Sequence, residues 1–145
     1  DSTVLVHIKY LVHLLGDMHC PTHVYYYPDN MTLGKFPVKL HGVETNYHKI
    51  WDGQLLDSRH KFWGFQDYRH ALDNYTDEEI ARMTEGTPVE WFEESARRCR
   101  EIYDWVQPGD ELGQEFYNAH APFAEYQLVL SGYRLAKVLN ALFDR

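Results

Sequence analysis

A chain of 145 residues is about the length of one domain, and its 44% hydrophobic and 15% aromatic residues can build a folded core, which excludes a disordered protein. It contains no run of about 18 apolar residues, so no membrane segment is predicted. The net charge of -8 argues against binding of long duplex nucleic acid through a basic face. A phosphate ligand would need another positive partner, and a bound metal ion is one candidate.

The first part of the chain predicts a helix followed by a long loop. Residues 3–19 are apolar on nearly all sides, which is typical of a buried central helix. Residues 20–44 carry several Pro, Gly and Asn residues and predict a loop, and a loop of this length is more often functional than idle. The segment FPVKL at 36–40 is the candidate for a short strand or hairpin inside this loop.

The later helices are predicted from their capping residues. Thr45 or Asn46 caps a second helix, and capping boxes at TDEE (76–79) and TPVE (87–90) open two more. The last helical stretch is expected to divide at Pro122. The predicted helices cover residues 45–56, 77–84, 88–107 and 111–143. We therefore expect one all-α domain, residues 1–145, with at most a short hairpin in the 20–44 loop.

Ionisable residues interrupt the apolar pattern of the first predicted helix. Asp17 follows His13 by four residues, so these two side chains project from the same face. His19 lies roughly 200° around the helix from Asp17 and is therefore not part of the pair. Pro21 ends the helix, and His23 can then fold back toward the face of the pair.

The second predicted helix repeats the His-x-x-x-Asp spacing. Its pair, His48 and Asp52, brings the number of candidate metal ligands to five: His13, Asp17, His23, His48 and Asp52. Nitrogen and carboxylate oxygen donors suit zinc, although manganese or iron also accept them. A single such pair is more often a hydrogen-bonded surface pair. Two pairs with His23 between them leave a metal site and a hydrogen-bonded cluster as the alternatives.

The cysteines and the remaining histidines carry weaker signals. Cys20 and Cys99 lack a Cys-x-x-Cys spacing, which argues against a cysteine-based zinc site, and the spacing leaves open whether they form a disulfide. The other histidines are interpreted as ordinary core or surface residues: His19, His41, His60, His70 and His120.

These motifs together resemble a known family. LVHLLGDMHCPTH (11–23) and TNYHKIWD (45–52) are similar to the patterns HxxGDxHQPLH and TNLHxxWD of the single-strand-specific zinc nucleases, the family of mung bean nuclease. WFEESARRC resembles the family's W-x-x-ES segment, and FYNAHAPFAEYQLVLSGYRLAKVLN resembles its closing helix. The resemblance implies an all-helical fold shared with zinc-dependent phospholipase C and a cluster of up to three zinc ions.

The resemblance also assigns roles to the five candidates. His13 and Asp17 correspond to ligands, with Asp17 as the catalytic residue that bridges two ions, and His23, His48 and Asp52 correspond to the ligands of another ion. The implied reaction is hydrolysis of single-stranded DNA or RNA to 5′-mononucleotides, together with removal of 3′-phosphates from nucleotides. A phospholipase C-like hydrolase and a non-catalytic helical fragment with a partial metal site are the alternatives. Family members are typically exported, which implies a secreted or periplasmic location.

The chain also departs from the family pattern. Further family ligands, including an N-terminal Trp, lie in an N-terminal half that has no counterpart here. The chain is therefore expected to be the C-terminal portion of a zinc nuclease, to be incomplete for catalysis, and to need the missing N-terminal portion as its partner. Fewer than three zinc ions are then expected. Cys20 stands at the position of Gln in the family's HQP sequence.

Overall fold

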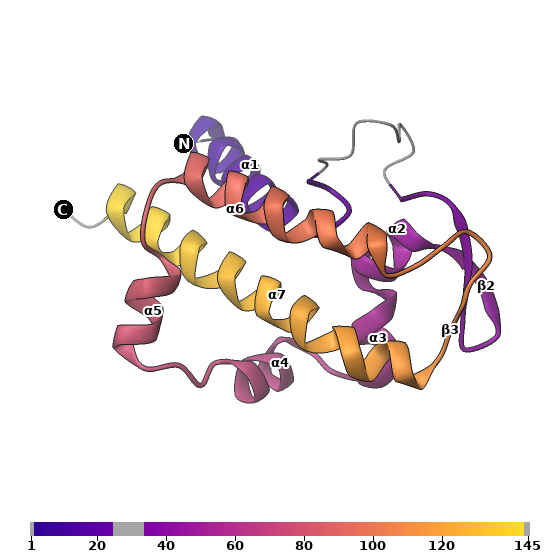
Figure 1. The fold of residues 1–145 in the computed structure, drawn as a ribbon. Coiled ribbons are helices and arrows are strands. Elements are labelled where there is room, and N and C mark those ends of the chain that lie inside the picture. The colour runs from indigo at the N-terminus through magenta and orange to yellow at the C-terminus, as the bar shows by residue number, and fades with distance from the viewer. Residues whose placement is uncertain (1, 25–33, 144–145) are drawn as a thin grey trace.

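Helices account for most of the structure, as predicted (Figure 1). The computed structural model describes residues 2–24 and 34–143. A π-helical turn η1 joins α2 to α3, a 3-10 turn η2 follows α6, and none of the described helices is long and apolar enough to cross a membrane. The helical segments are α1 (Ser2–Asp17), α2 (Tyr47–Lys49), η1 (Ile50–Gln54), α3 (Leu55–His60), α4 (Phe65–Leu72), α5 (Asp77–Met83), α6 (Pro88–Arg100), η2 (Glu101–Asp104) and α7 (Gln114–Phe143).

A small sheet closes one end of the helical fold. Its strands β1 (Pro37–Leu40) and β2 (Val43–Asn46) form an antiparallel hairpin, which confirms the short hairpin predicted from the sequence. His41 and Gly42 make the turn with φ values of 50° and 81°, the conformation that tight hairpins require. A third strand, β3 (Glu111–Leu112), pairs parallel with β1. The last helix was expected to begin at about residue 111, but this pairing delays its start to Gln114.

The central helix of the fold is α7, not α1. It extends between α1 and α6 on one side and α4 and α5 on the other (Figure 1), and it contacts α1, α3 and α5. The prediction that Pro122 divides this stretch is wrong, because α7 is continuous from Gln114 to Phe143. A proline inside a helix costs about 3 kcal/mol. Burial of Ala121, Gln127 and Leu130 on either side of the proline offsets that cost.

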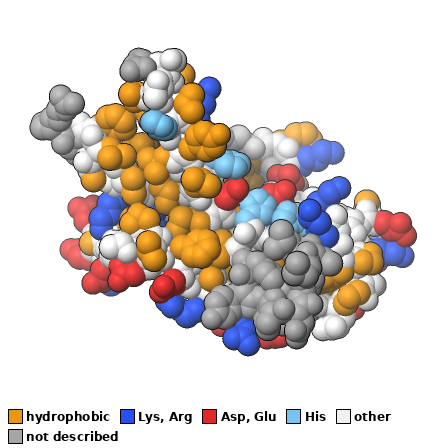
Figure 2. Space-filling view, turned by 90° about the horizontal axis from the view of Figure 1, so that it is seen from above, with side chains coloured by type: hydrophobic (Ala, Val, Ile, Leu, Met, Phe, Trp, Pro, Cys, Tyr) orange, Lys and Arg blue, Asp and Glu red, His pale blue; other side chains and the backbone are white. Residues whose placement is uncertain are grey.

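The prediction that the first helix is buried and central is also wrong for these residues. Leu15 is the buried residue of α1, whereas apolar side chains on its other faces are 43–63% exposed: Val4, Leu5, Val6, Tyr10, Val12 and Leu14. An apolar helix is buried only where other elements cover every side. Among the described residues, α7 is the main packing partner of α1 and covers one side. Figure 2 shows the resulting apolar surface.

The hydrophobic core lies between the sheet, the α2–α3 segment and η2. Its buried residues are Val38, Leu40, Tyr47, Ile50, Trp51, Leu55, Ile102, Val106 and Leu112. Tyr47 is fully buried and its hydroxyl donates a hydrogen bond to the Ile102 carbonyl at 2.6 Å. This contact joins α2 to η2 across the core, so the backbone that carries His48 and Asp52 is held in place from behind.

Capping residues define the helix starts as predicted. Thr76 and Thr87 each form a capping box, with Glu79 and Glu90 respectively, and Asn46 accepts a hydrogen bond from the Lys49 amide at 3.0 Å. The helix predicted near 88–107 is shorter, since α6 ends at Arg100 and continues as η2. Helix α4 was not predicted from the sequence.

Candidate metal centre

The turn that follows α1 brings the first set of site residues together. Backbone hydrogen bonds join the Cys20 amide to the Asp17 carbonyl and the His23 amide to the Cys20 carbonyl, each at 3.0 Å. The chain therefore coils tightly after Asp17 and returns His23 to the end of α1. The sequence predicted that His23 folds back toward the face of the first pair, and this geometry confirms it.

The second set comes from α2 and η1. This segment buries Tyr47, Ile50 and Trp51 in the core, while His48 is half-buried and Asp52 is exposed. The π-helical turn and the break from helical geometry at Gly53 interrupt the single helix that was expected over residues 45–56. His48 and Asp52 nevertheless lie beside the turn that carries His23.

One connected network includes four of the five predicted ligands. His13 Nε2 lies 3.2 Å from Asp17 Oδ2, and Asp17 Oδ1 lies 3.3 Å from His23 Nδ1. The second nitrogen of His23, Nε2, lies 3.3 Å from Asp52 Oδ1. The fifth residue, His48, stacks on the His23 ring with centroids 5.0 Å apart. We call these five residues the histidine–aspartate cluster.

The histidine–aspartate cluster is open to solvent on one side. The side chain of His13 is 68% exposed and that of Asp52 is 52% exposed, whereas His23 at the centre is 24% exposed. Figure 2 shows histidine and acidic side chains gathered on this face, beside the apolar surface. A ligand from solution can therefore reach the cluster while His23 is held between Asp17 and Asp52.

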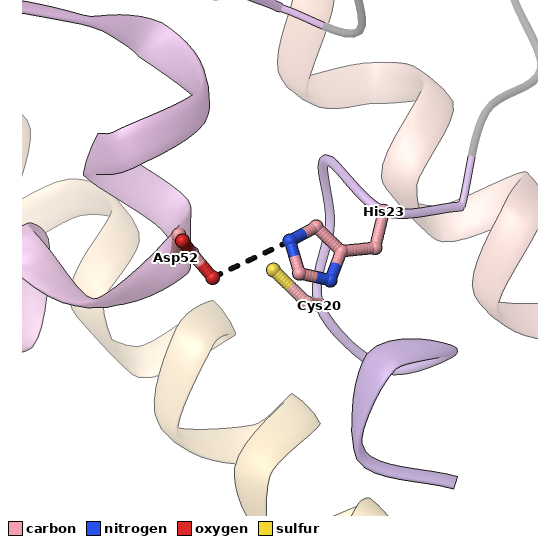
Figure 3. A group of neighbouring side chains, drawn as sticks. All are labelled: Cys20, His23 and Asp52. Carbon is pink, nitrogen blue, oxygen red and sulfur yellow. Dashed lines mark ion pairs between the residues drawn. The ribbon is translucent and has the colours of Figure 1, made fainter. Parts of the chain in front are cut away.

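A cysteine adjoins the histidine–aspartate cluster. Ligand atoms of Cys20, His23 and Asp52 all lie within 4.8 Å of one another, and no other group of three such residues occurs among the described residues. Figure 3 shows Cys20 and His23 extending from one turn toward Asp52 on the facing segment. The lack of a Cys-x-x-Cys spacing argues against a cysteine-based zinc site, and Cys20 is not among the five ligands predicted from the sequence. The usable signal was local, since Cys20 replaces the family's Gln three residues before His23.

The donor atoms fit a zinc-type ion. Zinc binds cysteine sulfur, histidine nitrogen and aspartate oxygen, at about 2.0 to 2.3 Å from the ion. Two ligands about 2.0 Å from a tetrahedral ion lie about 3.3 Å apart. The His23 Nε2 to Asp52 Oδ1 distance is 3.3 Å. Asp17 approaches the opposite nitrogen of His23, where a carboxylate orients a ligating imidazole ring.

His19 lies in a different environment, as its position on the opposite side of the helix predicted. It is 2% exposed, its Nδ1 donates to the Leu15 carbonyl at 2.7 Å, and its Nε2 accepts a hydrogen bond from Arg134 at 3.0 Å. Burial lowers the pKa of His19, which keeps the ring in the neutral form that this bonding requires. His19 is therefore a buried structural residue.

Arg134 joins His19 to the neighbouring helix. Its guanidinium forms a salt bridge with Glu94 of α6 and donates to the Met83 carbonyl at 2.9 Å. Gln127 donates to the His19 carbonyl at 3.1 Å. We call His19, Glu94, Gln127 and Arg134 the arginine network. Through the contacts of Gln127 and Arg134 with His19, it holds the turn after α1 on the side away from the histidine–aspartate cluster.

Both cysteines are free thiols in the structure. Cys20 is half-buried and lies 3.7 Å from the Trp51 carbonyl, whereas Cys99 is fully buried and accepts a hydrogen bond from Gln127 at 3.9 Å. Burial raises the pKa of both thiols, that of Cys99 to about 12. The disulfide left open by the sequence is therefore not formed here.

Comparisons with known proteins identify the family. The family model described as S1/P1 Nuclease matches residues 2–144. The chain belongs to this family. The predicted family membership is thus confirmed. In this chain, the segments WFEESARRC and FYNAHAPFAEYQLVLSGYRLAKVLN supply Glu94, Gln127 and Arg134 of the arginine network, which contacts the turn after α1.

Individual relatives are distant and longer. The chain is 26% identical to Endonuclease 4 of Arabidopsis thaliana over 99% of its own length and 54% of the relative. It is 27% identical to Endonuclease 2 of the same plant, over 94% of the chain and 51% of the relative. Nuclease S1 of Aspergillus oryzae is 26% identical over 97% of the chain and 55% of the relative. The chain therefore spans about half the length of the curated relatives it matches.

Proposed function

We propose that the protein containing this chain is a zinc-dependent nuclease and nucleotidase. It hydrolyses single-stranded DNA and RNA to 5′-mononucleotides and removes 3′-phosphates from nucleotides. The observation that carries the proposal is the convergence of four predicted ligands in one network, His13–Asp17–His23–Asp52, with His48 stacked on its central ring. Membership of the S1/P1 nuclease family supports the same reaction.

The residues of the histidine–aspartate cluster have distinct parts in this proposal. As the family resemblance implies, Asp17 is proposed as the ligand that two ions would share; one of its oxygens faces His13 and the other faces Nδ1 of His23. His23 and Asp52 would hold a zinc ion together with His48, whose ring stacks on that of His23. Bound zinc supplies positive charge at the phosphate and lowers the pKa of a water molecule. The open side of the cluster admits the phosphodiester.

The acidic composition supports a metal-centred site. A chain with net charge -8 offers little basic surface to a nucleic acid, so the ions have to meet the phosphate group. Bases and sugars can then be held by other parts of the protein while the scissile phosphate reaches the ions.

The proposal includes a partner for this chain. The matched relatives are about twice its length, and the apolar faces of α1 are exposed here. We therefore propose that an N-terminal portion of the same protein packs on α1 and completes a site of up to three zinc ions beside His13. Without that portion the chain is incomplete for catalysis. A secreted or periplasmic location follows from the family and is part of the proposal.

Hydrolysis by the full-length protein loaded with zinc tests this function. We expect cleavage of single-stranded DNA and of 3′-AMP, and no cleavage of phosphatidylcholine, the substrate of a phospholipase C-like enzyme. Loss of a residue that only hydrogen-bonds to a metal ligand lowers activity about 10- to 100-fold. Asp52→Asn removes a proposed ligand itself, so it should lower the rate by at least that factor. His70→Ala, at an exposed histidine on α4, is the matched control and should leave the rate unchanged.

Two results would contradict the proposal. Cleavage of phosphatidylcholine without cleavage of nucleic acid would identify a lipase-type hydrolase. A zinc-loaded full-length protein that cleaves neither class of substrate would favour the non-catalytic reading.

A further inference from the structure

We infer that the Cys20 thiolate is itself a ligand of the metal ion held by His23 and Asp52. This inference rests on the proposed metal centre and goes beyond it, because Cys20 replaces the Gln of the family pattern. Sulfur, nitrogen and oxygen donors from the three residues lie within 4.8 Å of one another. All three lie close enough to meet at a single ion after small side-chain rotations.

The position of Cys20 is set by the site itself. Its amide is bonded to the Asp17 carbonyl in the turn, and its Sγ lies 3.7 Å from the carbonyl of Trp51, the residue before Asp52. Thr22 lies 3.8 Å from the same sulfur. The side chain is therefore held between the two segments that carry His23 and Asp52 (Figure 3).

Cys20 and Cys99 differ in what surrounds the sulfur. Cys99 is fully buried, its sulfur accepts a hydrogen bond from Gln127, and it belongs to no group of three candidate ligands among the described residues. Cys20 is half-buried and has a histidine nitrogen and a carboxylate oxygen within 4.8 Å of its sulfur. Cys99 therefore serves as the internal control for effects of a free thiol.

The chemistry of coordination is simple to balance. The Sγ–H bond breaks, the proton passes to solvent, and the sulfur lone pair forms the bond to the ion, with no change of oxidation state. A thiolate, an imidazole and a carboxylate, with the His48 imidazole as the fourth donor of the proposed site, match the donor types and the number of ligands that zinc accepts. Thiolate also shifts selectivity toward zinc, cobalt and cadmium and away from manganese and magnesium.

Cobalt substitution tests the inference directly, because a cobalt–thiolate bond produces a near-ultraviolet charge-transfer band. We expect cobalt(II) to produce this band in the full-length wild-type protein and in Cys99→Ala. Cys20→Ser and Cys20→Gln, the latter with the family residue, should lose it. Both Cys20 variants should also bind zinc at least about 10-fold more weakly, while their affinity for manganese changes less.

Alkylation keeps the test independent of whether the variants fold. Iodoacetamide labelling of the wild-type protein, read by peptide mass spectrometry, should slow at Cys20 when zinc is bound and recover when a chelator removes it. Three results would each overturn the inference. They are a charge-transfer band that persists in Cys20→Ser, a wild-type spectrum without the band, and a labelling rate at Cys20 that is the same with and without zinc. If the zinc-loaded wild-type protein hydrolyses nucleic acid but its cobalt form shows no such band, Cys20 is not a ligand, and the proposed nuclease function is unaffected.

Discussion

His19 and His23 lie four residues apart in one turn, yet they belong to two regions with opposite properties. His23 lies at the centre of the histidine–aspartate cluster, between two carboxylates on an open face. His19 lies in the arginine network, 2% exposed and bonded to Arg134. The comparison teaches that neighbouring residues of one type are separated into ligand and structural roles by the partners that the fold supplies.

The arginine network should contribute most to stability. Arg134→Ala removes one of the two arginine partners of Glu94 and the partner of His19 Nε2. Arg134 is buried but Glu94 is half-buried, so the loss should lie near the lower end of the about 3–5 kcal/mol that breaking a buried ion pair costs. We expect that loss in the free energy of unfolding of the metal-free protein, measured by urea denaturation. Arg98→Ala removes the more exposed partner of the same Glu94, at 2.8 Å, and should cost no more than about 1 kcal/mol. Equal losses in the two variants would remove the distinction between the regions.

The histidine–aspartate cluster should contribute to stability only through metal. Zinc at about 100 times its Kd should raise the free energy of unfolding by about 2.7 kcal/mol in the wild-type protein. His23→Ala should abolish this increase while leaving the metal-free stability nearly unchanged, because the side chain faces the open site. Thermal unfolding with and without a chelator measures both quantities, with His70→Ala as control. A zinc-dependent increase that survives in His23→Ala would contradict the assignment.

Within the histidine–aspartate cluster, Asp17 should affect zinc binding. Asp17→Asn keeps the shape of the side chain but removes the charge that faces His13 and His23. We expect zinc affinity to fall by about 10- to 100-fold, or about 1.4–2.7 kcal/mol, in a competition titration. Asp57→Asn, at an exposed acid on α3, should leave the affinity unchanged and thus controls for net charge. An affinity in Asp17→Asn equal to that of the control would place Asp17 outside the metal site.

The smallest expected effect concerns the start of the helix that carries Glu94. Thr87 caps α6 through a box with Glu90, and loss of such a cap costs about 1 kcal/mol. Thr87→Ala should therefore lower the unfolding free energy by about that amount and leave zinc affinity unchanged, as measured by the same denaturation and titration. A change in zinc affinity would show that the two regions are more strongly coupled than their geometry indicates.

Local patterns allowed much of this structure to be predicted. Capping boxes at Thr76 and Thr87 locate helix starts because they depend on residues within one turn. The four-residue spacing places His13 beside Asp17 for the same reason. Helical spacing also predicted that His19 is separate from that pair, although His19 lies in the turn after α1 ends at Asp17.

Contacts between distant residues accounted for the errors. Pro122 lies within a continuous α7 because other helices pack on both halves of it, which no local pattern records. Strand β3 exists because residues 111–112 meet β1, more than 70 positions earlier. Helix α1 is apolar on nearly all sides but largely exposed. An apolar sequence favours burial, but it does not show which other segments are there to cover it.

The sequence by itself determined the helical class, the family and the five candidate ligands, because residue spacing and motifs are visible in the order of the residues alone. Only the tertiary structure placed His23 between Asp17 and Asp52, stacked His48 on it, and brought Cys20 to the same point. It also bonded His19 to Arg134, 115 positions away. The physical reason is that a ligand set is defined by distances of a few ångströms between atoms, and those distances arise when separate segments pack on a common core.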